Sequence, residues 1–366
     1  MIAEQPQVHD IADRDALLAA NEDAARFYRD QLRLGTSRGP RDYLTRRGFA
    51  AVFDHTTWTV GYAPSSWTAL VEHLTALGYS DPTLLEAGLA LKSRRGHLID
   101  RFRDRVTFGI RNVQSELIGF TARSSPASPD SVPKYLNTPT TAVYRKSENL
   151  FGLGEQAERL QTGATLVLVE GPLDAVAVDL ANDAESRFAP AALCGTALTE
   201  QHATQIAKMV TDDVIVSLDG DTAGNRAAEN AYLRLARHLS RLTTPRSMGG
   251  SDAAETLRSS GAKALNGHLR TTVPLANRVI NARLASWPNL HESAETELAA
   301  LRDVTRIVAR AQPTDVATLA RKLAIENGFD LPTVTRELAD AMTNSRAARC
   351  GPVPTGSGLA REPARS

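Results

Sequence analysis

The segments TLVLVEGPLDAVAV (Thr165–Val178) and DVIVSLDGDTAG (Asp213–Gly224) decide the fold class of this chain. Each begins with an apolar run rich in β-branched residues and continues into a pattern typical of a helix. Such uninterrupted apolar runs are typical of strands in a parallel sheet that is covered on both faces. We therefore predict an α/β module in which strands alternate with helices.

Three carboxylates directly follow these two predicted strands: Glu170 after the first, and Asp219 and Asp221 after the second. Parallel strands joined by right-handed crossovers end on one edge of the sheet, where ligands of open α/β sheets bind. If the strands are neighbours, the three side chains face one crevice. Three acids this close repel each other unless a cation neutralises them, and Mg2+ or Mn2+ takes such oxygen ligands and bridges to phosphates. Any one of them alone would be read as a turn former or helix cap, but the combination favours a metal site.

The composition is that of a globular protein without a strong charge. The chain has 366 residues, enough for two or three domains, with 42% hydrophobic and 23% charged residues. The 42 Lys and Arg residues balance the 42 Asp and Glu residues. This balance argues against a protein whose whole surface attracts nucleic acid by charge, but it allows a local basic groove.

The sequence also argues against several kinds of site and location. The two cysteines, Cys194 and Cys350, lack the spacing of a zinc site and cannot form a disulfide framework. No apolar run has membrane-spanning length, and no signal peptide opens the chain. We therefore expect a cytoplasmic protein with no zinc and no membrane partner.

The acidic motifs identify a known module. EGPLD (Glu170–Asp174) with DGDTAG (Asp219–Gly224) resembles the Toprim pattern of bacterial DnaG-type primases, topoisomerases and some nucleases. Three further stretches resemble DnaG-type primases in particular: GTALT (Gly195–Thr199), FRDRVTFGIR (Phe102–Arg111) and PKYLNTP (Pro133–Pro139). The part from Lys134 to Asn137 is the most specific, because topoisomerases and nucleases with Toprim modules lack it. The resemblance runs from about Ala24 to Met342.

The resemblance implies a mixed α+β N-terminal subdomain, a Rossmann-like parallel-sheet Toprim module and a C-terminal helical bundle. We expect a flexible leader (residues 1–20), the N-terminal subdomain (21–153), the Toprim module (154–265), the bundle (266–343) and a disordered tail (344–366). Full-length primases also carry a zinc ribbon and a helicase-binding domain, for which this sequence has neither room nor ligands. It therefore resembles a free-standing catalytic core of the kind that mobile elements carry.

Site residues follow from the same resemblance. It implies catalytic metal ligands at Glu170, Asp219 and Asp221, with a further acid at Asp252. The segment Ser251-Asp252 is also an ordinary helix N-cap, and Ala253 replaces the family's usual proline. The basic face for nucleotide and template would comprise Arg103, Arg105, Arg123, Lys134, Tyr135 and Asn137.

The chemistry of these residue types supports the assignment, although each has a plainer interpretation. Ammonium and guanidinium groups are the expected phosphate partners, and an aromatic ring stacks on bases. On composition alone, Lys134 would be a surface lysine and Tyr135 a half-buried tyrosine. Arg46 and Arg47, in the last turn of a helix expected over residues 38–47, either complement its dipole or contact template phosphates. His202 is expected on a solvated helix face.

The implied activity is synthesis of short RNA primers on single-stranded DNA from ribonucleoside triphosphates, dependent on Mg2+ or Mn2+. Whether Glu170 is a metal ligand or a general base stays open. One alternative is a Toprim-type nuclease, which needs the acids but not Lys134 and Tyr135. Another is a non-enzymatic single-stranded-DNA-binding replication accessory protein, against which the intact acids speak. Efficient initiation would require a partner such as a replicative helicase or a separate zinc-bearing protein.

Overall fold

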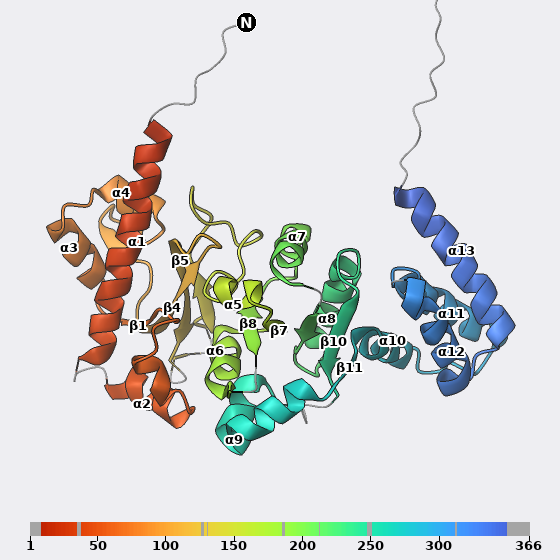
Figure 1. Ribbon diagram of the computed structural model, residues 1–366. Coiled ribbons are helices and arrows are strands. Elements are labelled where there is room, and N and C mark those ends of the chain that lie inside the picture. The colour runs from red at the N-terminus through yellow and green to blue at the C-terminus, as the bar shows by residue number, and fades with distance from the viewer. Residues whose placement is uncertain are drawn as a thin grey trace, which may run out of the picture. The chain divides into compact units, whose positions relative to one another are not determined.

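The computed structural model describes residues 9–34, 38–125, 128–129, 131–184, 187–211, 213–246, 251–311 and 313–349. It divides into two compact units, Met1–Val279 and Ile280–Ser366 (Figure 1). No helix within the described ranges is long and apolar enough to cross a membrane.

The N-terminal subdomain is built on an antiparallel sheet with the strand order β1-β4-β5-β6. Its strands are β1 (Val60–Ala63), β4 (Arg105–Arg111), β5 (Leu117–Ser124) and β6 (Tyr135–Asn137). The two faces alternate along each strand, as a pleated sheet requires. Phe120 points towards helix α1, where its ring meets Tyr28 edge-on, whereas Val106 and Phe108 join the core shared with the Toprim module. Both faces of the sheet are therefore covered.

Helices and a hairpin complete this subdomain. They are α1 (His9–Arg33), α2 (Arg38–Arg46), the 3-10 helix η2 (Ala50–Phe53), α3 (Ala69–Ala76), α4 (Asp81–Glu86), β2 (Ala90–Lys92) and β3 (Leu98–Asp100). The prediction of a flexible leader over residues 1–20 is wrong from His9 onward, because α1 begins there and buries Leu17 and Ala20. Residues 1–8 lie outside the described part of the chain.

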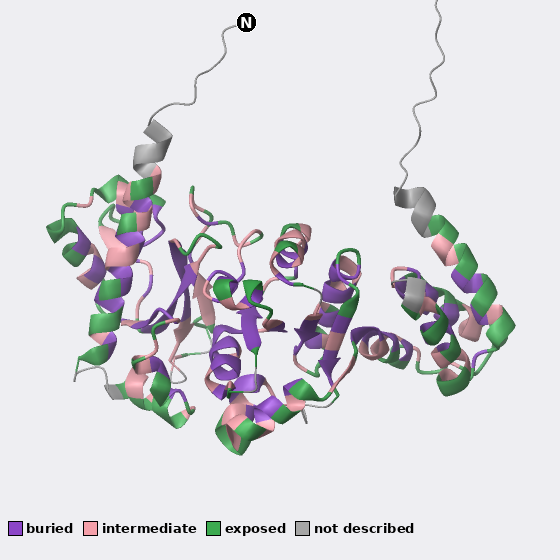
Figure 2. Ribbon diagram, in the orientation of Figure 1, coloured by how far each residue is buried: buried purple, intermediate pink, exposed green. Residues whose placement is uncertain are grey.

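The Toprim module has a five-stranded sheet of order β11-β10-β9-β7-β8. Its strands are β7 (Thr165–Val169), β8 (Phe188–Ala192), β9 (Asp213–Val216), β10 (Arg241–Pro245) and β11 (Thr272–Pro274). The first four run parallel, and β11 is antiparallel to β10. Strands β7 and β9 are direct neighbours, with Leu166 opposite Val214, and their side chains are almost entirely buried (Figure 2). The predicted parallel sheet is therefore confirmed.

The helices of this module are α5 (Ala157–Gln161), α6 (Pro172–Ala181), α7 (Glu200–Met209), α8 (Thr222–Leu235) and α9 (Ala253–Arg270). Helix α6 packs against β7 and β8 and along α9. His202 of α7 is fully buried, so its predicted exposure is wrong. Its ring accepts a hydrogen bond from the Thr199 N–H and lies 3.1 Å from the Lys146 carbonyl oxygen, which ties α7 to the segment between β6 and α5.

The second unit is helical. Helix α10 (Leu275–Ala285) crosses into it and is followed by α11 (Ala294–Val308), α12 (Pro313–Asn327) and α13 (Leu331–Arg349). Its core contains Leu301, Val304, Val308, Leu323, Val334 and Leu338. The predicted domain boundary after residue 265 falls inside α9, whereas the units divide after Val279. The predicted tail begins at residue 344, but α13 continues to Arg349, and residues 350–366 lie outside the described part.

Candidate active site

Two of the predicted acids meet at the carboxyl edge of the parallel sheet. Glu170 follows β7 and Asp219 follows β9, and the Asp219 N–H donates to Glu170 Oε1 over 3.1 Å. Partial burial raises the pKa of Glu170, and the charge of Asp219 raises it further. The pKa of Asp219 is raised by its own burial and then by the charges of Asp252 and Asp221. The charges of Asp221 and Asp252 therefore act on the neighbouring pair of Glu170 and Asp219.

Asp221 and Asp252 also cap helices. Asp221 Oδ1 accepts from the Gly224 N–H at 2.7 Å at the start of α8, and Asp252 Oδ1 accepts from the Glu255 N–H at 2.6 Å at the start of α9. The capping interpretation of Ser251-Asp252 is thus confirmed without excluding a role in the acidic group. Asp221 is exposed, which leaves its second oxygen accessible to solvent.

A cavity of about 310 Å³ lies beside these acids. Its polar and charged lining residues are Arg47, Arg123, Lys134, Tyr135, Glu170, Asp174, Thr196, Asp219 and Asp252. Acidic side chains come from the Toprim module, and the basic ones are Arg47 just after α2, Arg123 of β5 and Lys134 just before β6. The cavity is therefore bipolar, with carboxylates on one wall and cations on the other.

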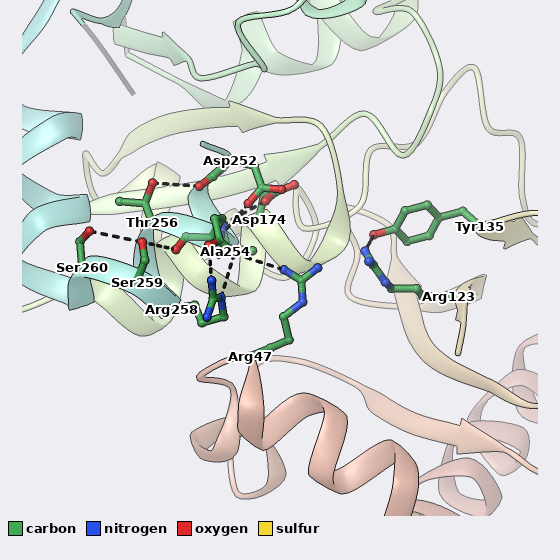
Figure 3. Close-up of polar contacts among 11 residues, drawn as sticks. Arg47, Arg123, Tyr135, Asp174, Asp252, Ala254, Thr256, Arg258, Ser259 and Ser260 are labelled. Atoms are coloured by element: carbon green, nitrogen blue, oxygen red, sulfur yellow. Dashed lines mark hydrogen bonds and ion pairs between the residues drawn. The ribbon is translucent and has the colours of Figure 1, made fainter. Parts of the chain in front are cut away.

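Strand register explains the basic wall. Arg123 and Tyr135 are directly opposite each other on β5 and β6, and Arg123 Nη1 donates to Tyr135 Oη at 2.8 Å (Figure 3). Lys134 is exposed, and its charge lowers the pKa of Asp219, against the larger opposing effects described above. A Cβ atom added to Gly171 would lie 3.3 Å from Tyr135 Oη, so β6 closely approaches the N-terminus of α6.

Three of the predicted basic-face residues do not line the cavity. Arg105 is buried on the opposite face of β4 from Val106, and Arg105 Nη1 donates to the Pro133 carbonyl at 2.9 Å. Arg103 stacks on the Trp67 ring, 4.2 Å from its centroid, and donates to the Asp100 carbonyl. Asn137 is two residues beyond Tyr135 on the same strand face, and its carbonyl accepts from the Arg101 side chain.

Asp174 is a site residue that the sequence analysis did not single out. Its Oδ2 accepts from the Gly171 N–H and its Oδ1 from the Ala254 N–H, both at 3.1 Å, so it joins the starts of α6 and α9. Burial, with a further contribution from the charge of Asp252, raises its pKa to about 7. The sequence did contain a signal for Asp174, because this residue lies within the EGPLD motif. Its position inside a predicted helix, however, did not indicate what the carboxylate would bind.

Two arginines complete the surroundings. Arg47 reaches from α2 towards the acidic wall, and its Nη1 is 4.0 Å from Glu255 Oε2 (Figure 3). Arg278 of α10 donates to the backbone carbonyls of Leu218 at 2.9 Å and of Asp219. No sequence pattern pointed to Arg278, because it lies some sixty residues beyond the strand that it supports.

The acidic wall fits a divalent cation, although it is not a closed cage. Within the described ranges, no three His, Cys, Asp or Glu side chains converge as a complete metal site. Mg2+ is usually held by one or two carboxylates, waters and substrate phosphates, so a full protein cage is not required. Glu170 and Asp219 supply hard oxygen donors, and their raised pKa values reflect partial burial and then the repulsion of neighbouring acids, which a cation would relieve.

Comparison with known proteins agrees with this arrangement. The family described as "DNA primase catalytic core, N-terminal domain" matches residues 27–157, and the one described as "Toprim-like" matches residues 167–257. The DNA primase of Mycolicibacterium smegmatis is 36% identical over 328 residues, which are 88% of this chain and 50% of that protein. The chain thus spans about half the length of the curated relatives it matches.

Solved structures extend the comparison to the fold. The RNA polymerase domain of Mycobacterium tuberculosis primase DnaG superimposes with a TM-score of 0.72 at 33% identity, covering 85% of this chain and 98% of that one. The same domain in complex with a double-stranded DNA oligomer with a 6-nucleotide overhang gives 0.69 at 33% identity, covering 86% and 98%.

Proposed function

Because the chain belongs to the family of DnaG-type DNA primases, we propose that it makes short RNA primers on a single-stranded DNA template. The observation that carries this proposal is the bipolar cavity. An acidic wall at Glu170 and Asp219 faces a basic wall at Arg123 and Lys134 across a cavity of about 310 Å³. A nucleotidyl transferase needs both, since its substrate carries negative phosphates that must reach a cation site.

Each wall has a proposed part in the reaction. Lys134, Arg123 and Arg47 bind the triphosphate of the incoming ribonucleotide and the template backbone, with Tyr135 fixed by its hydrogen bond to Arg123. Glu170, Asp219 and Asp252, with Asp221 beside them, hold Mg2+ or Mn2+. When bound, the cation supplies positive charge that stabilises the α-phosphate under attack and the departing pyrophosphate.

Other residues keep this arrangement in place. Arg278 holds the Leu218 and Asp219 carbonyls, which fixes the turn that carries the acid. Asp174 binds backbone N–H groups of both α6 and α9, and so holds the Glu170 and Asp252 segments together. Glu170 has an alternative part in this proposal, as a general base that takes the proton of the 3′-hydroxyl instead of serving as a metal ligand.

The template and partners are carried over from the relatives as part of the proposal. The M. tuberculosis domain was solved with DNA, and we propose that this chain likewise binds DNA, with the single-stranded template lying along the basic wall. Template selection would come from elsewhere, through a replicative helicase or a zinc-bearing partner, since phosphate contacts carry no sequence information.

The test is a primer-synthesis assay. The protein is incubated with single-stranded DNA, labelled ribonucleotides and Mg2+ or Mn2+, and the products are resolved on a denaturing gel. We expect short RNA products from the wild type and from Asp81→Asn, an exposed acid of α4, but not from Asp219→Asn. Cleavage of the DNA without nucleotides would favour the nuclease, and a folded wild type that binds DNA but makes no product would favour the accessory protein.

A further inference from the structure

A second cavity, of about 190 Å³, lies in the N-terminal subdomain and shares no lining residue with the first. It is formed where the end of α1, η2 and the segment leading into β1 come together. Its lining residues are Arg29, Leu32, Arg33, Val52, Phe53, Asp54, His55, Thr56, Trp58 and Val60. None of the primer-synthesis steps proposed above uses this cavity.

Two arginines at the cavity have no partner within the described part of the chain. Arg29 and Arg33 are four residues apart on α1, and neither guanidinium makes a hydrogen bond or ion pair there. Like charges at this spacing on a helix repel each other. A third cation, Arg41 of α2, stacks 4.8 Å from the centroid of the Phe53 ring and donates to the Arg33 carbonyl at 3.4 Å. Asp54 is the one acid among the lining residues, so the net charge of the lining is positive.

His55 adds a polar atom that lacks a partner. Its Nε2 lies 3.8 Å from Asp179 Oδ2, whereas its Nδ1 is buried and unbonded among the described residues. Asp179 is itself held by Trp58 Nε1 at 2.8 Å and by Arg159, which fixes the carboxylate that faces the imidazole. The half-buried His55 ring therefore borders the cavity with one nitrogen facing a fixed carboxylate and the other enclosed by the protein.

The remaining walls restrict the kind of ligand. Leu32, Val52, Trp58 and Val60 are buried apolar side chains, so the cavity does not suit a small, fully hydrated anion alone. The cavity therefore combines apolar side chains with polar and charged groups, which suits an organic molecule with an apolar body and an oriented charged group. A phosphate ester with its sugar has this combination.

We propose that this cavity is a second phosphate-binding site, which takes the phosphate of a nucleotide on Arg29 and Arg33, with the half-buried His55 ring beside it. Planar guanidinium groups recognise phosphate through paired hydrogen bonds. The site contacts the Toprim module through Asp179 of α6, the helix whose other end adjoins Glu170. The inference does not depend on polymerase activity.

The experiment uses Trp58 as a reporter inside the cavity. The chain has three tryptophans, so the double variant Trp67→Phe/Trp287→Phe leaves Trp58 as the only one. Its fluorescence is followed during titration, with divalent metal chelated, with inorganic pyrophosphate, ATP or an oligothymidylate that lacks a 5′-phosphate. We expect a saturable change, and Arg29→Gln or Arg33→Gln should each weaken binding by roughly tenfold.

Matched controls separate this site from general charge and from the first cavity. Arg94→Gln removes an exposed arginine in the β2–β3 turn and should leave the titration unchanged, as should Lys134→Ala in the first cavity. A response to pyrophosphate and ATP supports a free nucleotide as ligand, and a response to the oligonucleotide alone supports a strand phosphate. No saturable response to any of the three, or equal binding by wild type and Arg29→Gln/Arg33→Gln, would overturn the proposal.

Discussion

At the scale of single residues, the acids at the sheet edge are destabilising for the free protein. Partial burial and mutual repulsion raise the pKa values of Glu170 and Asp219 together. Removing a carboxylate relieves part of this cost, whereas losing a metal ligand impairs chemistry. Stability and activity should therefore change in opposite directions, a pattern that a purely structural acid would not give.

The first prediction uses that contrast. Asp219→Asn and Glu170→Gln should each lower nucleotide incorporation by about a hundredfold or more. The free energy of unfolding without metal should stay equal to that of the wild type or rise. Primer assays and urea titrations measure the two quantities, with Asp81→Asn as the control. A folded Asp219→Asn protein with wild-type synthesis would remove the acid from the catalytic assignment.

The second prediction concerns the basic wall. Lys134→Ala and Arg123→Ala should each weaken binding of single-stranded DNA and reduce the slope of log affinity against log salt by about 0.7, as expected for one lost phosphate contact. Fluorescence anisotropy at several salt concentrations measures both. Arg94→Ala serves as the charge-matched control. Unchanged affinity and slope in both variants would make these two residues ordinary surface charges.

The third prediction follows from Glu155, which joins the Toprim module to the end of β4. Its Oε1 accepts from the Arg111 N–H at 2.9 Å, and its Oε2 is buried without a partner among the described residues. Burial raises its pKa from 4.5 to about 7. The folded state therefore holds the proton more tightly than the unfolded state, and stability is lost as pH rises through this interval.

Glu155→Gln removes this titration. The stability of the variant relative to the wild type should increase by roughly 1–3 kcal/mol between pH 4.5 and pH 7.5. Asp174, with a pKa also near 7, and His202, whose pKa burial lowers to about 4, titrate in both proteins and cancel in the difference. Urea unfolding of both proteins across this pH range, without divalent metal, measures the difference in their free energies of unfolding. Parallel pH profiles would show that the carboxyl is not held in the protonated form.

At the scale of elements, the local sequence was sufficient to predict secondary structure where a hydrophobic pattern spans one strand and the helix that follows it. The β-branched runs before Glu170 and Asp219 predicted two parallel strands, and the pairing of Leu166 with Val214 shows that these strands are neighbours. Strand alternation was less informative in the N-terminal sheet, because both of its faces are covered. Nothing in the sequence therefore indicated that Arg105 and Arg123 lie on opposite faces. The flexible leader was expected to reach residue 20 because buried positions in the first half of α1, such as Ala20, are alanines and give a weak periodic signal.

The turn from β9 into α8 gives the fourth prediction. A Cβ atom at Gly224 would lie 2.2 Å from the Asp219 carbonyl oxygen, a backbone atom that cannot move without displacing the acid. Gly224→Ala should therefore destabilise the protein by about 1–3 kcal/mol and also reduce incorporation. Gly220→Ala is the matched control, because no atom lies within 4 Å of its added Cβ. Thermal unfolding and primer assays compare the two. If both variants had the same stability and activity, the turn would accommodate the added Cβ atom at Gly224 without displacing Asp219.

At the scale of the whole molecule, contacts between distant segments escaped prediction. Arg278 supports the Asp219 turn from α10, and no local pattern marks it. Arg47 could be read from the sequence as a dipole complement or a template contact, but its position beside the acidic wall depends on packing between distant segments. The charge balance of the chain allowed a local basic groove, but only the resemblance to primases indicated a basic face together with the acids. Such features depend on tertiary packing, which periodicity does not encode.

The last prediction concerns the two compact units, each of which has its own buried core. A ligand that binds the native state stabilises the unit that holds it by RT ln(1 + [L]/Kd), about 2.7 kcal/mol at a hundredfold excess over Kd. The 310 Å³ cavity is lined only by residues of Met1–Val279. Mg2+ with ATP should therefore slow amide hydrogen exchange in the strands and helices of Thr165–Gly224, and leave exchange in α11 and α13 unchanged.

Hydrogen-exchange mass spectrometry measures both regions in one sample, with Asp219→Asn as the control that should show no slowing. Equal slowing in α11 and α13 would mean that the chain unfolds as one cooperative body and that its two cores are not energetically separate.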